Sequence, residues 1–183
     1  FRFIKKFEGF AHQIDFIQES DEGDIWVTDS EAGVFKVVLS KDNEEILSVK
    51  SYDTLQGLPS LDGNRVYRAN NELVFATNNG IYEYDRTKDL FVPKKELTEA
   101  LEGSYVTRFA EANDGTVFIS GGKGKGLLRK VNGSFEFQRT PFQQLDEFST
   151  QHATALGTDN FWIGSDVIHH HDPTGNFKPV GTF

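Results

Sequence analysis

The chain has 183 residues, of which 37% are hydrophobic and 13% aromatic, so it can bury enough apolar surface to fold with a core of its own. Its formal net charge of −9 would repel phosphate backbones and anionic membrane surfaces on average, which argues against nucleic-acid or membrane-surface binding. No apolar run approaches the roughly 18 residues that a membrane-spanning helix needs, so direct membrane insertion of this segment is not expected.

The residue types that are missing carry further information. Cysteine is absent, which excludes disulfides, thiolate metal sites and cysteine nucleophiles but leaves both a cytoplasmic and a periplasmic location open. The sequence begins at Phe1, contains no methionine and shows no signal peptide. We therefore expect it to be a piece of a longer protein.

Short strands separated by turn residues are predicted from the start of the chain. The clearest group is a hairpin over residues 25–39, in which Trp26 lies in the first apolar run and Gly33 opens the second. Flanking strands are predicted over residues 12–18 and 45–52. Each run is too brief for a helix, and the breakers between them contain glycine, aspartate and asparagine.

The hairpin recurs three times. The central residues of the four first strands are Trp26, Val74, Phe118 and Trp162, at intervals of 48, 44 and 44 residues. The residues aligned at the start of the second strands are Gly33, Gly80, Gly126 and Asp166. Four copies at near-constant spacing form an internal repeat, and a period of about 40–50 residues built from short strands favours a propeller with one four-stranded sheet per blade.

We therefore predict an all-β fold, a β-propeller of four-stranded antiparallel blades with about four blades present. The predicted divisions are 1–10 for the outer strand of a preceding blade, 11–60 for blade 1, 61–103 for blade 2, 104–150 for blade 3 and 151–183 for blade 4. Apolar residues at helical spacing predict one or two helical turns within residues 94–103, and residues 143–148 hold the corresponding place in the next repeat.

Several segments resemble two-component regulator propeller repeats, whose pattern is roughly Asp-Gly-Asn-Leu-Trp-Ile-Gly-Thr, a short loop, then Gly-Leu. The segments that carry the resemblance are DEGDIWVTDSEAGVFKV at 21–37, the Gly-Leu-Pro linker YDTLQGLPS at 52–60, ELVFATNNGIYEYD at 72–85 and NFWIGSD at 160–166. Val74 and Phe118 stand where the family has tryptophan, and the third repeat lacks the threonine that follows the strand.

The resemblance implies a function as well as a fold. Such repeats form the periplasmic sensor of membrane-bound bacterial regulators, commonly as two seven-bladed propellers followed by a sandwich domain, a membrane helix and a kinase or DNA-binding domain. It thus implies that this chain is part of a larger, seven-bladed propeller and a non-enzymatic segment of a signalling protein, without a cofactor. In many gut Bacteroidetes the ligands are polysaccharide fragments, so the implied partners are a small molecule or oligosaccharide, and other blades or a second protomer.

Two other functions stay open. A propeller enzyme, such as a polysaccharide lyase or glycosidase, would need carboxylates or histidines gathered at the propeller axis. The sequence shows no recognisable order of catalytic residues, such as Ser, His and Asp. A structural or protein-binding propeller is the third hypothesis. Residues of the inner strands line the central face of a propeller, and the candidates there are Arg65, Tyr67, Arg108 and His152, although the sequence assigns a ligand to none of them.

Two motifs suggest chemistry. Residues 121–126 (GGKGKG) resemble a phosphate loop, but strand residues follow where Ser or Thr and a helix would be needed, so a hairpin loop is favoured. Its lysines, Lys123 and Lys125, could still contact an anion. Residues 169–172 (HHHD) contain metal-ligand types, but on a strand only His169 and His171 share a face, which favours an ordinary strand.

The acidic residues around 19–24 lack the spacing of an EF-hand calcium loop, so a solvated turn is favoured there. Neither this turn nor the two motifs above is predicted to be a metal or catalytic site.

We expect the 183-residue chain in solution to be an open arc of four blades or a small forced ring, with apolar faces exposed at residues 1–10 and 177–183. Small-angle scattering of the purified chain measures this. A compact, stable monomer would instead favour a complete four-bladed propeller.

Overall fold

The computed structural model describes residues 12–29, 31–69, 72–164 and 167–182. These residues form four antiparallel sheets of four strands each, which confirms the predicted all-β architecture. We call the sheets blades 1 to 4 in chain order. The predicted outer strand of a preceding blade, at 1–10, lies outside the described residues, as does the predicted turn at 70–71.

In every blade the strands are neighbours in sequence order. Blade 1 contains β1 (Phe16–Glu19), β2 (Ile25–Asp29), β3 (Gly33–Leu39) and β4 (Ile46–Tyr52). Blade 2 contains β5 (Arg65–Ala69), β6 (Glu72–Thr77), β7 (Gly80–Asp85) and β8 (Leu90–Pro93). Blade 3 contains β9 (Val106–Glu111), β10 (Val117–Gly121), β11 (Gly124–Val131) and β12 (Ser134–Gln138). Blade 4 contains β13 (His152–Ala155), β14 (Phe161–Gly164), β15 (Val167–His171) and β16 (Phe177–Thr182).

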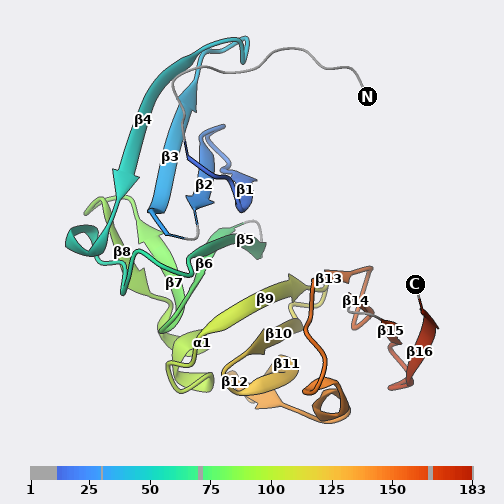
Figure 1. Ribbon diagram of the computed structural model, residues 1–183. Helices are drawn as coiled ribbons and strands as arrows, with labels where there is room; N and C mark the ends of the chain where they lie inside the picture. The colour runs from blue at the N-terminus through green and yellow to red at the C-terminus, as the bar shows by residue number, and fades with distance from the viewer. Residues whose placement is uncertain (1–11, 30, 70–71, 165–166, 183) are drawn as a thin grey trace.

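The first strand of each blade is the inner one. β1 lies beside β5, β5 beside β9, and β9 beside β13, so the blades follow one another along an arc with these strands on its inner side (Figure 1). The outer strands β4, β8 and β12 lie farther from this line. The arrangement places residues that start the inner strands close together although they are about 40 positions apart in sequence.

In blades 1 to 3, the hairpin between the two middle strands turns at a glycine in the left-handed region. Gly33 and Gly80 both have φ of +93°, and each pairs with the residue three positions after the central residue of the preceding strand. In blade 3 the residue at this register is Gly124, with φ of +86°, and it pairs with Gly121. The alignment of Gly126 with Gly33 was therefore wrong by two residues, because Gly126 lies inside the ladder opposite Ile119. The aligned position in blade 4, residue 166, is outside the described residues.

The blades pack face to face through the central residue of their second strand. Trp26 is 2% exposed and contacts four aromatic rings of blades 1 and 2 at centroid distances of 4.7–6.0 Å. Val74 occupies the same position between blades 2 and 3, and Phe118 between blades 3 and 4. Trp26 is thus a packing residue, as expected from its replacement by valine and phenylalanine in the next two repeats.

Trp162, the residue at this position in blade 4, has a different environment. Phe161 and Ile163 face blade 3, so Trp162 points to the opposite side of its sheet. There it is only partly buried and stacks on His170 with ring centroids 4.4 Å apart. The same repeat position is therefore a core residue in blades 1 to 3 and a partly exposed one in blade 4.

The predicted helical turns at 94–103 are confirmed. Helix α1 (Lys95–Ala100) follows β8 and buries Leu97, while Leu101 caps its end in the core between blades 2 and 3. The 3₁₀ turns are η1 (Thr54–Gln56) and η2 (Phe142–Leu145), and η2 holds the place after blade 3 that α1 holds after blade 2. The six-residue α1 is far too short to cross a bilayer, and the described residues contain no other helix that could.

Replacing Trp26 with alanine should cost about 3–5 kcal/mol of unfolding free energy, because it empties an enclosed site between two blades. The matched change Trp162→Ala should cost less than about 2 kcal/mol, because that ring is already in partial contact with water. Equilibrium denaturation followed by far-UV circular dichroism measures both. Equal losses for the two variants would contradict the packing described above.

Candidate functional site

The inner strands of all four blades converge on a pocket of about 450 Å³. The four candidates that the sequence suggested, Arg65, Tyr67, Arg108 and His152, all line it, and Asp15 joins them from the start of blade 1. The fold therefore brings together residues that span nearly the whole chain.

Several of these side chains also hold adjacent blades together. The Tyr67 hydroxyl donates to the carbonyl of Thr107 at 3.0 Å, and Arg65 Nη1 donates to the carbonyl of Val106 at 3.3 Å, so both link β5 to β9. Arg108 Nε donates to the carbonyl of Gln151 at 2.7 Å, which links blade 3 to blade 4. Burial raises the pKa of Tyr67, so its phenol remains a donor at neutral pH. Main-chain carbonyls orient the guanidinium groups without neutralising their charge.

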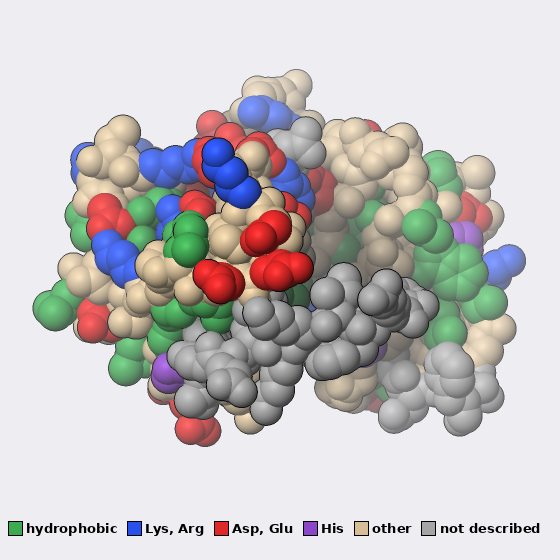
Figure 2. Space-filling model, turned by 90° about the horizontal axis from the view of Figure 1, so that it is seen from above, with side chains coloured by type: hydrophobic (Ala, Val, Ile, Leu, Met, Phe, Trp, Pro, Cys, Tyr) green, Lys and Arg blue, Asp and Glu red, His purple; other side chains and the backbone are tan. Residues whose placement is uncertain are grey.

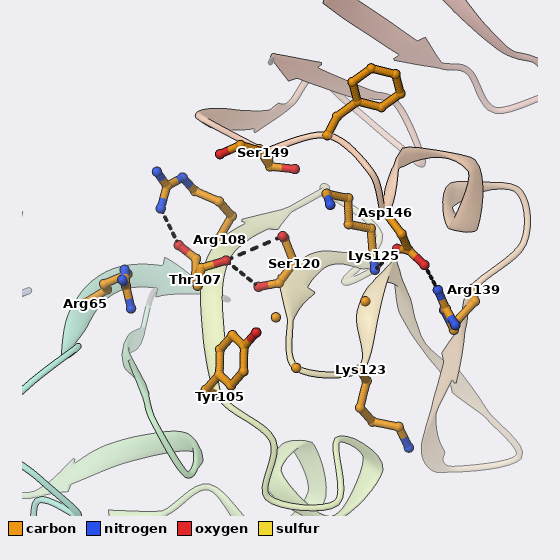
Figure 3. Close-up of a pocket in the computed structure, with 15 residues that line it drawn as sticks. Arg65, Tyr105, Thr107, Arg108, Ser120, Lys123, Lys125, Arg139, Asp146 and Ser149 are labelled. Atoms are coloured by element: carbon orange, nitrogen blue, oxygen red, sulfur yellow. Dashed lines mark hydrogen bonds and ion pairs between the residues drawn. The ribbon is translucent and has the colours of Figure 1, made fainter. Parts of the chain in front are cut away.

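A wider groove of about 840 Å³ adjoins this pocket, and Arg65 and Arg108 line both (Figure 3). One side comes from the start of β9, another from the β10–β11 hairpin, and a third from the linker between blades 3 and 4. This is the face on which the middle hairpins and the blade-to-blade linkers lie. Sequence reasoning did not find the groove, although it did single out the two lysines of the hairpin.

The glycines of the hairpin are explained by close approach. A Cβ on Gly121 would lie 2.0 Å from the carbonyl oxygen of Tyr105, and one on Gly124 would lie 2.7 Å from Arg139 Nη2 and 2.9 Å from Asp146 Oδ1. The hairpin can therefore lie directly against β9 on one side and the Arg139–Asp146 ion pair on the other. β11 follows it, so the predicted hairpin loop is confirmed and a helix-capped phosphate loop is not formed.

The groove is strongly cationic. Its charged lining residues are Arg65, Arg108, Lys123, Lys125, Arg139 and Asp146. Five cationic side chains thus line the groove against one carboxylate, although the chain as a whole has a net charge of −9. On the face seen in Figure 2, by contrast, acidic and basic side chains are interspersed.

Lys125 differs from the other groove cations. Only 7% of its surface is exposed, whereas Lys123 reaches outward to pair with Glu102 at 2.7 Å. Burial lowers the pKa of Lys125, and the nearby Arg139 guanidinium lowers it further. The structure gives its Nζ no hydrogen bond or ion pair among the described residues.

The histidine run is a strand with two faces, as predicted. His169 and His171 are 9% and 3% exposed on one side, and His170 lies on the other. His171 Nε2 lies 3.2 Å from Asp159 Oδ1, and the same carboxylate accepts two 2.7 Å bonds from Arg129. Within the described ranges, no three metal-ligating side chains gather in one place.

The acidic turn of blade 1 is occupied by cations of the protein itself. Asp24 pairs with Lys36 at 2.6 Å, Asp21 pairs with Arg68, and Glu22 pairs with Arg86. These ion pairs support the interpretation of this segment as a surface turn.

Comparison with known proteins identifies the fold. No family model matches the chain, and no curated protein matches it. The extracellular domain of BT4673, a one-component or hybrid two-component system of B. thetaiotaomicron, superposes with a TM-score of 0.64 at 16% identity, over 91% of this chain and 23% of that one. The chain has a propeller fold.

Other solved structures agree with this. The extracellular domain of the hybrid two-component system BT3049 from B. thetaiotaomicron matches with a TM-score of 0.55 at 16% identity, over 83% of this chain and 20% of that one. A catalytically inactive virginiamycin B lyase from Staphylococcus aureus, in complex with quinupristin, matches with a TM-score of 0.59 at 16% identity, over 89% of this chain and 53% of that one. The chain thus spans under a quarter of each sensor domain and about half of the lyase.

Replacing Lys125 with methionine should raise the unfolding free energy at pH 7 by on the order of 1 kcal/mol, because it removes a partly desolvated charge that lies near the Arg139 guanidinium and has no partner among the described residues. The unfolded chain holds its lysine proton up to about pH 10.4, while the folded chain releases it earlier, so the wild type should gain stability as the pH rises through the lowered pKa. The difference between variant and wild type should therefore shrink toward pH 10.

Denaturant unfolding across this pH range measures the effect, with Lys41→Met on an exposed turn of blade 1 as the control. A Lys125→Met protein less stable than wild type at pH 7 would show that the ammonium has a stabilising partner.

Proposed function

We propose that this chain is a non-enzymatic, ligand-binding part of an extracytoplasmic sensor in a bacterial two-component-type regulator. The observation that carries the proposal is the convergence of inner-strand residues from four blades on one pocket and its adjoining groove. The likeness of the fold to the extracellular domains of BT4673 and BT3049 supports it. The motif resemblance at residues 21–37 and 160–166 points the same way.

We propose an oligosaccharide, or another small polar molecule, as the ligand. Sugar hydroxyls are bound by fixed hydrogen-bonding groups together with flat aromatic surfaces. Arg65 and Arg108 supply oriented donors, and Tyr105 and Phe148 line the groove with 49% and 39% of their surfaces exposed. The site therefore offers both elements of such recognition.

Signal transfer would follow from the position of the site at the joints between blades. Arg65, Tyr67 and Arg108 already bond across β5–β9 and β9–β13, so a ligand that engages them would favour one arrangement of neighbouring blades. Other blades of a larger propeller, or a second protomer, would then receive that change.

A propeller lyase is the second candidate, and two observations favour it. Virginiamycin B lyase shares the fold, and His152 and Asp15 line the same pocket from opposite ends of the chain. A histidine in an open polar pocket can serve as a general base. Turnover of a bound oligosaccharide, seen as new reducing ends or unsaturated products, would favour this candidate over the sensor.

An oligosaccharide array followed by calorimetric titration tests the proposed function. Tyr105→Ala and His152→Ala should each weaken binding of a selected ligand about tenfold, or roughly 1.4 kcal/mol, because both exposed residues line the site. Leu47→Ala, on the outer strand β4, should leave affinity unchanged. Equal affinities for the three variants would contradict the placement of the ligand site.

A further inference from the structure

We propose that the groove binds an oxyanionic group, a carboxylate or sulfate, at the ammonium of Lys125. The group would be carried by the ligand that occupies the groove between the β10–β11 hairpin and the linker after β12 (Figure 3). The anion site is inferred from the contacts and charges of the groove itself. Only its assignment to a larger ligand rests on the proposed function.

The first observation is a lysine with a buried stem whose ammonium lines the groove and has no partner among the described residues. Lys125 is more than nine-tenths buried, and its ammonium makes no hydrogen bond or ion pair within the described part of the chain. The stem of Lys125 is buried while its ammonium opens into the groove, so the charge is accessible to an anion from solvent. The main-chain N–H of Lys125 donates to Asp146 Oδ1 at 3.1 Å, which holds the residue in place, but its ammonium has no partner among the described residues.

The second observation is that the nearby carboxylate is already in use. Asp146 accepts the Lys125 main-chain N–H through one oxygen and pairs with Arg139 through the other. Figure 3 shows the Lys125 side chain extending away from Asp146, toward the space near Ser120 and Ser149. Asp146 therefore forms an ion pair with Arg139 alone, and within the described residues its carboxylate makes none with the Lys125 ammonium.

The remaining lining of the groove suits an oxyanion. Ser120 lies opposite Lys125 in the β10–β11 ladder and lines the groove together with Thr107, whose hydroxyl donates to the Ser120 carbonyl at 3.0 Å. Arg65 and Arg108 add positive charge from the other wall, and the groove's one acidic side chain is engaged as described above. An anion bound here would gain hydrogen bonds in which donor and acceptor carry opposite charges, whereas a neutral group would lack that attraction.

The size of the groove indicates that the anion belongs to something larger than an inorganic ion. Its volume of about 840 Å³ lies in the range of sites for small organic ligands. Tyr105 and Phe148 present partly exposed rings along the same groove, which suit the apolar face of a sugar ring. An acidic saccharide combines both features.

Calorimetry and thermal unfolding at constant ionic strength test the site, with sodium sulfate, trigalacturonic acid and its neutral methyl ester as probes. The proteins are the wild type, Lys125→Met and the exposed control Lys41→Met. Sulfate should raise the melting temperature of the wild type and of Lys41→Met by more than that of Lys125→Met, which should show only the general stabilisation that excluded sulfate gives any protein. The acidic trisaccharide should bind the wild type at least about tenfold more tightly than it binds Lys125→Met.

The outcomes separate the anion site from the ligand-binding role. A sulfate response that is larger in the wild type than in Lys125→Met, without trisaccharide binding, upholds the anion site and removes its assignment to a saccharide. Equal binding of acid and ester by wild type and Lys125→Met overturns the anion site while leaving ligand binding intact. A wild type whose melting temperature and titration respond to neither sulfate nor the acid also overturns it. Cooperative unfolding of Lys125→Met shows that a lost response is not a folding failure.

Discussion

One contact holds this arrangement of blades together: the central residue of each blade's second strand packs against the next blade. Trp26, Val74 and Phe118 share this position, and each is at most 2% exposed. A single repeat has two apolar faces and cannot bury both alone, so every blade requires a neighbour. Trp162 shows the consequence where blade 4 presents the same position to solvent, since its ring is only partly buried and stacks on His170.

Face-to-face packing also determines where function can reside. It brings the inner strands side by side and leaves the middle hairpins and the linkers on one face. Side chains on that face are not needed to fill the core, so they can contact a ligand. The groove combines residues from the starts of β5 and β9, the β10–β11 hairpin and the linker after β12. Its glycines permit the hairpin to approach both walls, and this approach buries Lys125 beside an ion pair that leaves its charge unpaired.

The repeat, the strands and α1 could be predicted from the sequence because each depends on local pattern: apolar runs, breakers and near-constant spacing. Arg65, Tyr67, Arg108 and His152 were also predictable as inner-strand residues, and they do line one pocket. The error at Gly126 arose because four of the six residues 121–126 are glycine, and only strand register selects Gly124. The groove could not be predicted, since neither the burial of Lys125 nor the pairing of Asp146 with Arg139 is encoded by spacing.

The central claim is that Lys125, whose stem is buried, holds an ammonium without a protein partner in the groove, and that this ammonium binds an anion. Nitrogen-15 NMR of labelled lysine side chains, with the Lys125 signal assigned by its loss in Lys125→Met, measures this directly. The Lys125 ammonium should titrate below the ordinary lysine pKa near 10.4, and added sulfate should raise that pKa toward the ordinary value. A Lys125 signal that titrates with the exposed lysines and does not respond to sulfate would contradict the claim.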